Sequence, residues 1–475
     1  MGAQQSKTEP TLHEKAVLER LQNLQVQDQD DYVEVISDAE KSSIGPLIRD
    51  AEGLPLHVLE SWQAAIIKDP KNKLALTALS SANPRQVLTS LPTEIADQQI
   101  YNVKIPFEGD PITNQRSSGR CWLFASTNVF RVALMKRFDL ESFELSQQYL
   151  FYWDKLEKAN WFLEQIIDTA TEDLEGRVVQ TLLSDLVSDG GQWDMVYNLV
   201  EKYGLVPQTL YPDSWNAMSS GILNSLVKTK LREFALRLRA LVNSKDGVSA
   251  AAISSAKDKM LRPPAQDHPK EFAKNIYSPS FPVTSSTVSG MISLVHDPRH
   301  EPLSHLTVSR LGNIVGGRGI SYVNVDIDTL KGACVKMLKA GLPIFFGSDV
   351  GQFSDSRSGI MDLNLYNYEL GLNTSLLGMT KAQRLMTGES QMTHAMVLTA
   401  VHLDEQTGKP VRWRVQNSWG TTAGDKGWFV MSDAWLDEFV YQAVVDPRVL
   451  SKEVRDVLKK EAIVLPLWDP MGSLA

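Results

Sequence analysis

Cysteine is scarce in this chain, and long apolar stretches are absent. Only Cys121 and Cys334 occur among 475 residues, which excludes a disulfide framework. No run approaches the roughly 18 apolar residues that cross a bilayer, and the N-terminus lacks the apolar core of a signal peptide. With 43% hydrophobic and 22% charged residues, the composition is that of a globular protein. We therefore expect an intracellular, cytoplasmic protein without a membrane span.

An excess of positive charge is also absent. The formal net charge is −9, which predicts no general attraction to nucleic acid or anionic lipid. Residues 221–274 are the exception, with eleven Lys or Arg against five Asp or Glu. A solvated basic face is the default interpretation of such a segment. Weak binding of single-stranded nucleic acid is the alternative.

The first 55 residues are polar and are predicted to form a disordered leader. Met1–Ser6 fits the M-G-x-x-x-[ST] pattern for myristoylation of Gly2. One acyl chain would hold a membrane only weakly. The leader is acidic and has few arginines, so a mitochondrial location is less favoured than a cytoplasmic one.

One cysteine stands at the junction of two unlike stretches. The loop Asn114–Gly119 is polar, and the residues after Cys121 are periodically apolar, which predicts a helix beginning at the cysteine. The positive end of a helix dipole favours a thiolate there. A buried structural thiol is the alternative, and this is our interpretation of Cys334, which lies in a helical pattern.

Three further residues favour a nucleophile at Cys121. Gln115 could donate a side-chain N–H to an oxyanion beside the Cys121 backbone N–H. Of the eight histidines only His394 begins a strongly apolar stretch, and it is the candidate base. Asn417 could orient its ring.

This order of Gln, Cys, His and Asn resembles the papain-like cysteine peptidases. Other stretches resemble one branch of them, the bleomycin hydrolases, from about residue 57 to the end; they are 143–151, 152–160, 297–300, 310–313 and 465–472. The resemblance implies an α+β, papain-like fold with two lobes, one helical and one β-rich, and a helical hook-type insertion. Secreted relatives carry a cysteine three residues before the nucleophile, where this chain has Ser118.

The resemblance divides the chain into segments. They are 1–55, the leader; 56–214, an N-terminal extension and the helical lobe with the nucleophile; 215–290, a shortened basic hook; 291–462, the β-rich lobe with His and Asn; and 463–475, an arm in the active-site cleft. In relatives the hook links subunits, which implies self-association up to a hexamer. The short linker with Pro263 and Pro264 departs from that pattern and weakens the hexamer prediction.

Paired glycines at Gly190 and Gly191 allow a substrate backbone to approach closely. A plain helix-breaking turn is the alternative. The resemblance implies that Gly191 hydrogen-bonds the substrate. It also implies supporting roles for Trp122 and Trp419, of which Trp419 shields the His394–Asn417 bond from water.

The C-terminus is apolar, contains Pro466 and Pro470 and ends at Ala475. A frayed tail is the usual fate of a chain end. The resemblance instead implies that the Ala475 carboxylate binds the substrate's α-ammonium in the cleft.

The predicted function is a cysteine-type aminopeptidase that acts on peptides with free N-termini, without metal or cofactor. Bleomycin and homocysteine thiolactone hydrolysis are implied by the resemblance. An endopeptidase is the alternative if the tail lies elsewhere, and a nucleic-acid-binding regulator is another.

Overall fold

A computed structural model describes residues 54–245, 247–261, 288 and 290–474. The predicted leader up to residue 53, the Gly2 motif, the linker with Pro263 and Pro264, and Ala475 lie outside the described residues. The chain forms two units, one up to Thr77 and one from Ala78 to the end. The first residues of the segment 56–214 form two helices, α3 (Leu56–Ile67) and α4 (Pro70–Ser81).

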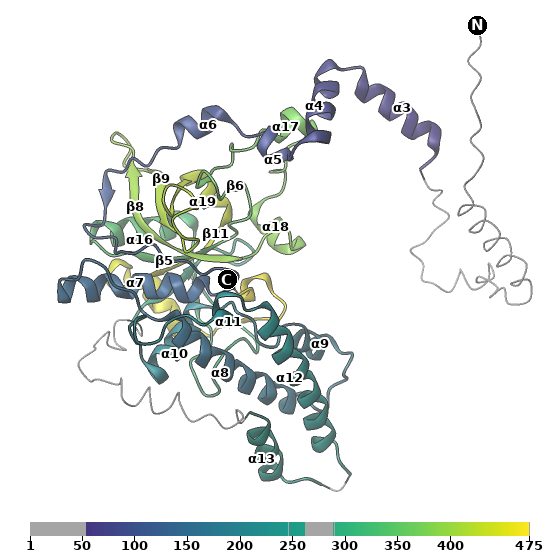
Figure 1. Ribbon diagram of the computed structural model, residues 1–475, viewed down its shortest axis with the longest axis vertical. Coiled ribbons are helices and arrows are strands. Elements are labelled where there is room, and N and C mark those ends of the chain that lie inside the picture. Colours follow the sequence, from purple (N-terminus) through teal and green to yellow (C-terminus); the bar gives the residue numbers. More distant parts are fainter. Residues whose placement is uncertain (1–53, 246, 262–287, 289, 475) are drawn as a thin grey trace, which may run out of the picture. The chain divides into compact units, whose positions relative to one another are not determined.

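The larger unit begins with a helical half that carries the predicted nucleophile. Its longest helix pair, α8 and α12, lies side by side, with α13 against both (Figure 1). Ser146 caps α8 by accepting a hydrogen bond from the Tyr149 backbone N–H, which fixes where that helix begins. The elements are α5 (Pro84–Val87), α6 (Leu91–Ala96), β1 (Val103–Lys104), α7 (Cys121–Phe138), α8 (Gln147–Asp168), α9 (Arg177–Ser184), α10 (Trp193–Tyr203), α11 (Trp215–Met218), α12 (Gly221–Val242) and α13 (Ala250–Leu261).

The second half is built on one mixed sheet. Its path is β12-β3-β4-β2-β11-β5-β8-β9-β10-β7-β6, and β1 pairs with β8 off this path. The strands are β2 (Ile292–Val295), β3 (Ser304–Val308), β4 (Tyr322–Asn324), β5 (Ile344–Ser348), β6 (Ser354–Asp355), β7 (Ile360–Met361), β8 (His394–Leu403), β9 (Pro410–Gln416), β10 (Trp428–Ser432), β11 (Val440–Val445) and β12 (Ile463–Leu465). The helices of this half are α16 (Ile327–Lys339), α17 (Tyr368–Leu372), α18 (Lys381–Thr387), α19 (Asp433–Phe439) and α20 (Lys452–Asp456), with 3-10 turns η1 (Pro447–Val449), η2 (Val457–Lys459) and η3 (Pro470–Gly472).

Sequence reasoning did not predict the bounds of strand β2, although the strand lies in the segment 291–462 that was expected to be β-rich. Its four residues are all buried, because β4 and β11 flank it and both its faces are covered. Its sequence, Ile-Ser-Leu-Val, is too short for periodicity alone to identify it as a strand.

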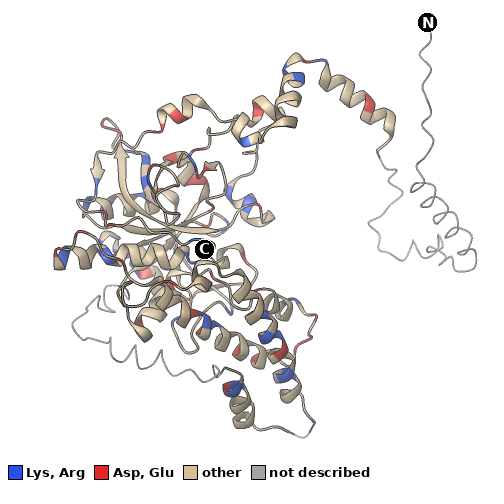
Figure 2. Ribbon diagram, viewed as in Figure 1, with Lys and Arg blue, Asp and Glu red and all other residues tan. Residues whose placement is uncertain are grey.

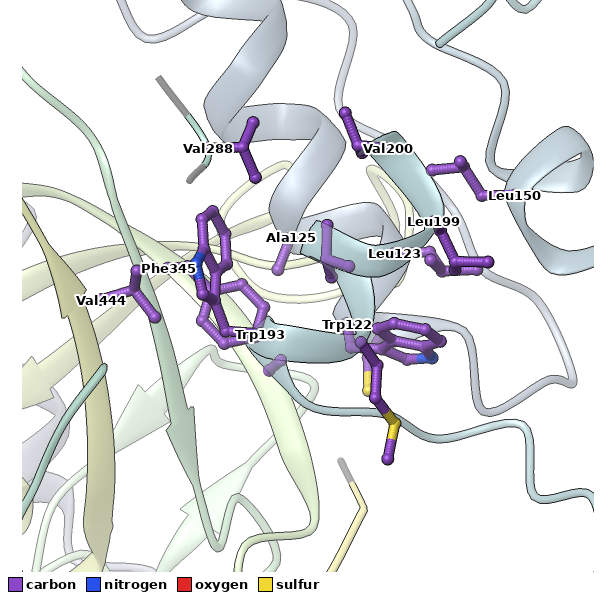
Figure 3. Close-up of a cluster of buried hydrophobic side chains, with 14 of the residues drawn as sticks. Trp122, Leu123, Ala125, Leu150, Trp193, Leu199, Val200, Val288, Phe345 and Val444 are labelled. Carbon is purple, nitrogen blue, oxygen red and sulfur yellow. The ribbon is translucent and has the colours of Figure 1, made fainter. Parts of the chain in front are cut away.

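A continuous core joins the two halves where α7 crosses β5 and β8. The Trp193 ring of α10 packs edge-on against Phe345 of β5, with centroids 5.4 Å apart. Figure 3 shows Leu123 and Ala125 of α7 in the same cluster. Each fully buried side chain of this size contributes roughly 1.5–3 kcal/mol, so the crossing is strongly held. The crossing sets the first residue of α7 near the first residue of β8.

Candidate active site

The loop before α7 is shaped by a buried arginine. Arg120 is fully buried, and its guanidinium binds Asp213 through two nitrogens at 2.9 and 3.0 Å. Its Nε also donates to the Ser118 hydroxyl at 2.9 Å. Such a bidentate pair is geometrically specific. Arg120 therefore fixes the turn that presents Cys121, and sequence reasoning did not identify this role.

Four of the nine predicted site residues line a single open pocket of about 360 Å³, namely Gln115, Cys121, Gly190 and His394. Cys121 is 2% exposed and begins α7, as predicted, and His394 is 4% exposed and begins β8. The other lining residues are Gly119, Asp185, Ser188, Asp189, Asn224, Lys228, Thr393 and Leu474. A thiol and an imidazole from distant parts of the chain thus share one cavity.

Asn417 fixes the tautomer of His394. The Asn417 Oδ1 atom lies 2.9 Å from His394 Nε2 and accepts from the Ser418 backbone N–H at 2.7 Å. Because a backbone N–H only donates, the atom is an oxygen, and Nε2 must carry a proton. Nδ1 is then the ring nitrogen that can accept the proton of the thiol. The Trp419 ring lies 4.8 Å from the His394 ring, centroid to centroid, and covers it.

The side chain of Gln115 is held at both ends of its amide. Nε2 donates to the Ser118 carbonyl at 2.6 Å, and Oε1 accepts from the Ser418 hydroxyl at 2.7 Å. One N–H of the amide is left for another acceptor. Ser418, which sequence reasoning overlooked, therefore contacts both the amide that orients His394 and the candidate oxyanion donor.

Burial opposes a charge on either member of the Cys121–His394 pair. It raises the pKa of Cys121 to about 11, although the backbone N–H groups of Ala395, Trp122 and Cys121 act in the opposite direction. Burial lowers the pKa of His394 to about 4, against the hydrogen bond to Asn417. The sequence suggested that the positive end of the helix dipole favours a thiolate. The raised pKa shows that the helix terminus alone does not deprotonate Cys121. A thiolate requires a neighbouring positive charge, which His394 can supply by taking the proton.

Two lysines of α8 hold the segment with the paired glycines, and one of them, Lys155, donates to the Val187 carbonyl at 2.7 Å. Lys158 donates to the carbonyls of Ser188 at 2.9 Å and Gly190 at 2.6 Å. A Cβ at Gly191 would lie 2.5 Å from the Trp122 ring, so that position requires glycine. Gly190 lines the pocket, whereas Gly191 is buried against Trp122 and is not among the lining residues. The supporting position predicted for Trp122 is thus beneath the glycine segment.

Asp189 connects this segment to the nucleophile loop and to the insertion. Its carboxylate accepts from the Gly119 backbone N–H at 3.1 Å and from Asn224 at 2.8 Å, and it pairs with Lys155 at 2.5 Å. The charge of Lys155 and these hydrogen bonds hold its pKa below the usual range despite burial. Lys228, also from α12, pairs with Asp185 at 2.9 Å on the pocket wall. The insertion thus supplies part of the pocket.

The C-terminal segment, yellow in Figure 1, lies between the helical half and the sheet. The Ser473 carbonyl accepts from Gln192 Nε2, and its hydroxyl donates to the Met392 carbonyl at 2.8 Å. Arg299 anchors the preceding turn through Asp469 at 2.7 Å. Leu474 then lines the pocket with Cys121. The candidate residue Ala475 follows directly but lies outside the described residues.

The basic residues of α12, coloured blue in Figure 2, contact other groups of the molecule. Lys230 and Arg237 of α12 both pair with Glu233. Arg232 donates to the Leu183 carbonyl, and Arg239 is 9% exposed and donates to two carbonyls after α8. Together with the Lys228–Asp185 pair, these contacts occupy all five cations of α12.

The described residues lack two features that other functions would require. None of the helices described is long and apolar enough to cross a bilayer. In the same residues, no three His, Cys, Asp or Glu side chains cluster as a metal site would require. Cys334 lies in α16 and is fully buried in the core, as predicted.

Comparison with known proteins identifies close relatives. The Peptidase C1-like family matches residues 53–263 and 266–472. Bleomycin hydrolase of Homo sapiens is 41% identical over 441 residues, which are 86% of this chain and 95% of that protein. Cysteine proteinase 1, mitochondrial, of Saccharomyces cerevisiae is 39% identical over 469 residues, or 90% and 94% of the two chains.

A solved structure supports the same conclusion. The crystal structure of PepW from Lactobacillus rhamnosis superposes with a TM-score of 0.82 at 38% identity, covering 89% of this chain and 99% of that one. Family, sequence relatives and fold therefore agree, and they agree with the α+β, papain-like architecture expected from the sequence. The chain belongs to the bleomycin hydrolase family and is a papain-like cysteine peptidase.

Proposed function

We propose that this protein is an aminopeptidase that removes N-terminal residues by acyl transfer to Cys121. The observation that carries the proposal is the shared pocket: Cys121 and His394 line it together, and Leu474, near the chain end, forms part of its wall. Cys121 and His394 supply a nucleophile and a base. Leu474 shortens the part of the cleft that holds the acyl side of the substrate, where an endopeptidase needs an open groove.

The first chemical step uses the proton of the thiol. It passes from Cys121 Sγ to His394 Nδ1, so that the two charges form together and each offsets the cost of the other. The sulfur attacks the scissile carbonyl carbon, and the carbonyl oxygen becomes an oxyanion. Gln115 donates its remaining N–H to that oxygen, alongside the Cys121 backbone N–H.

The second step releases the amine. His394 gives its proton to the leaving nitrogen, the carbon–nitrogen bond breaks, and a thioester with Cys121 remains. A water molecule then loses a proton to His394 and attacks the thioester carbon. The carbon–sulfur bond breaks, His394 returns the proton to Cys121 Sγ, and the free amino acid is released. Asn417 keeps the imidazole in the required tautomer throughout, and Trp419 keeps water from their hydrogen bond.

The C-terminal arm defines the register of cleavage. Leu474 lines the pocket, and Ala475 is the next residue in the sequence. A carboxylate there would bind the α-ammonium of a substrate by a charge-assisted hydrogen bond. Only the first residue then fits between that anchor and Cys121. Bleomycin and homocysteine thiolactone, acyl compounds with a nearby amine, fit the same arrangement.

The alternative of a nucleic-acid-binding regulator has weaker support. Its basis was the basic insertion, whose α12 cations are paired with acidic groups or bound to carbonyls. A solvated row of free cations would be needed for strong phosphate binding. Self-association and a cytoplasmic location remain predictions, which sedimentation and cell fractionation test.

The proposal is tested with aminoacyl-coumarin substrates. Cys121→Ala should abolish hydrolysis. Its thermal denaturation curve should keep the Tm of the wild-type protein, which shows that the variant is folded. Cys334→Ala is the matched control, because it removes the other thiol, which lies in the core. Removal of Leu474 and Ala475 should add internal cleavage of longer peptides. Activity that survives in Cys121→Ala would refute the acyl-transfer proposal.

A further inference from the structure

A second pocket, of about 380 Å³, shares the Trp419 ring with the active site. It is formed by the start of the larger unit and by the loops around β6, and we name it the arginine pocket. Its principal residues are Arg85, Arg357, Asp355, Tyr366 and Trp419. Cys121, His394, Asn417 and Gln115 do not line it, and Trp419 is the only one of its residues that the mechanism above uses.

The arginine pocket lies on the leaving-group side of His394. A group that protonates a leaving amine must stand beside that amine, so what packs against His394 borders the leaving group. Trp419 does so at 4.8 Å and continues into the arginine pocket. The other side of the catalytic pocket is walled by Leu474. A leaving peptide therefore runs over Trp419.

The charge of the arginine pocket is positive. Arg85 donates to the Gly351 carbonyl at 3.3 Å and lies 5.7 Å from the Tyr366 ring centroid. No acidic side chain of the described ranges pairs with it. Asp355 is the acidic member, but it accepts from the Ser358 backbone N–H at 2.9 Å and is 3.9 Å from Arg357. Two guanidinium groups against one engaged carboxylate leave room for an anion.

We propose that the arginine pocket binds the C-terminal carboxylate of the leaving peptide. This would make short peptides with a free carboxyl end the preferred substrate class. The planar guanidinium groups of Arg85 and Arg357 suit bidentate contact with a carboxylate, and the Tyr366 and Trp419 rings accommodate the apolar part of the last residue. The inference rests on the proposed aminopeptidase function, because it needs a leaving peptide.

The experiment compares each peptide with its C-terminal amide. The series Ala-Gly, Ala-Gly-Gly and Ala-Gly-Gly-Gly, each as free acid and as amide, is hydrolysed at low ionic strength and kcat/KM is measured. Because exposed ion pairs contribute only modestly, we expect a preference for the acid of about two- to five-fold per arginine at one length. Arg85→Gln combined with Arg357→Gln should bring the ratio close to one, and lysine at both positions should keep part of it. Added salt should lower the ratio in the wild-type protein.

The control variant is Arg448→Gln, since Arg448 is exposed, pairs with Asp446 and does not line the arginine pocket. It should keep the wild-type ratio at every length. Equal rates for acid and amide at all lengths, or a ratio unchanged in the double glutamine variant, would overturn the inference. Alanyl-coumarin, which has no carboxylate, separates the two proposals. If it and all peptides resist hydrolysis, the aminopeptidase proposal itself fails.

Discussion

The rate at which Cys121 is alkylated should hardly change between pH 5 and 8. Burial puts the pKa of Cys121 near 11 and that of His394 near 4, so between these limits the pair holds one proton that neither group releases alone. The reactive thiolate forms by internal transfer, whose extent is independent of pH. Below about pH 4 the ring takes up a second proton and the rate should fall.

The matched variant is His394→Gln, which removes the internal acceptor. Cys121 must then lose its proton to solvent, and its thiolate fraction rises tenfold per pH unit below its pKa. From pH 5 to 8 the alkylation rate should rise about 10³-fold in the variant and less than about twofold in the wild-type protein. This holds whether the thiol keeps its pKa near 11 or returns to the ordinary value of 9.

The assay follows iodoacetamide incorporation by mass spectrometry in a Cys334→Ala background, so that only Cys121 reacts. Circular dichroism at each pH checks that the fold persists. A tenfold rise per pH unit in the wild-type protein would show that Cys121 titrates as an isolated thiol. The same result in both proteins would show that His394 does not take its proton, and the proposed mechanism would be wrong.

Two substitutions test the groups that support the site. Gly191→Ala places a Cβ within 2.5 Å of the Trp122 ring, and overpacking of this kind costs roughly 1–3 kcal/mol, so thermal denaturation should show a lower Tm. Gly332→Ala in α16, where the Cβ meets open space, should instead raise the Tm slightly. Ser418→Ala removes the hydrogen bond to Gln115 Oε1; a buried unsatisfied group costs about 1–3 kcal/mol, so kcat should fall roughly tenfold with little change in KM. A KM effect alone would contradict the positioning role.

Sequence reasoning predicted the parts of the site that have local signals. A polar loop followed by periodic apolar residues indicated that a helix begins at Cys121, and α7 does so. An apolar run indicated a strand at His394, which is the first residue of β8. Both signals lie within a few residues of the feature they predict, and the family pattern then related the two positions to each other.

The residues that hold the site together had no such local signal. From the sequence alone, Arg120 and Lys158 would be expected at the surface. In the structure Arg120 is fully buried and pairs with Asp213, 93 positions away, and Lys158 donates to the Gly190 carbonyl. Charged residues are rarely buried unless paired, and the pairing is decided by tertiary contacts. The expectation of a dipole-charged thiolate at Cys121 was incomplete for the same reason: burial is not visible in a local pattern.

We expect the C-terminal arm to affect both the type of cleavage and the protonation of the Cys121–His394 pair. Leu474 lines the pocket together with Cys121 and His394, and burial of these two residues is what moves their pKa values. Removing Leu474 and Ala475 should therefore hydrate the pair and return the pKa of His394 from about 4 towards 6.5. The ring would then take up a second proton at higher pH, so the acid limb of the alkylation profile should move upwards in the truncated protein. Truncation could instead permit internal cleavage of peptides while the acid limb of the alkylation profile stays near pH 4. That result would show that the arm selects substrates without controlling the hydration of Cys121 and His394.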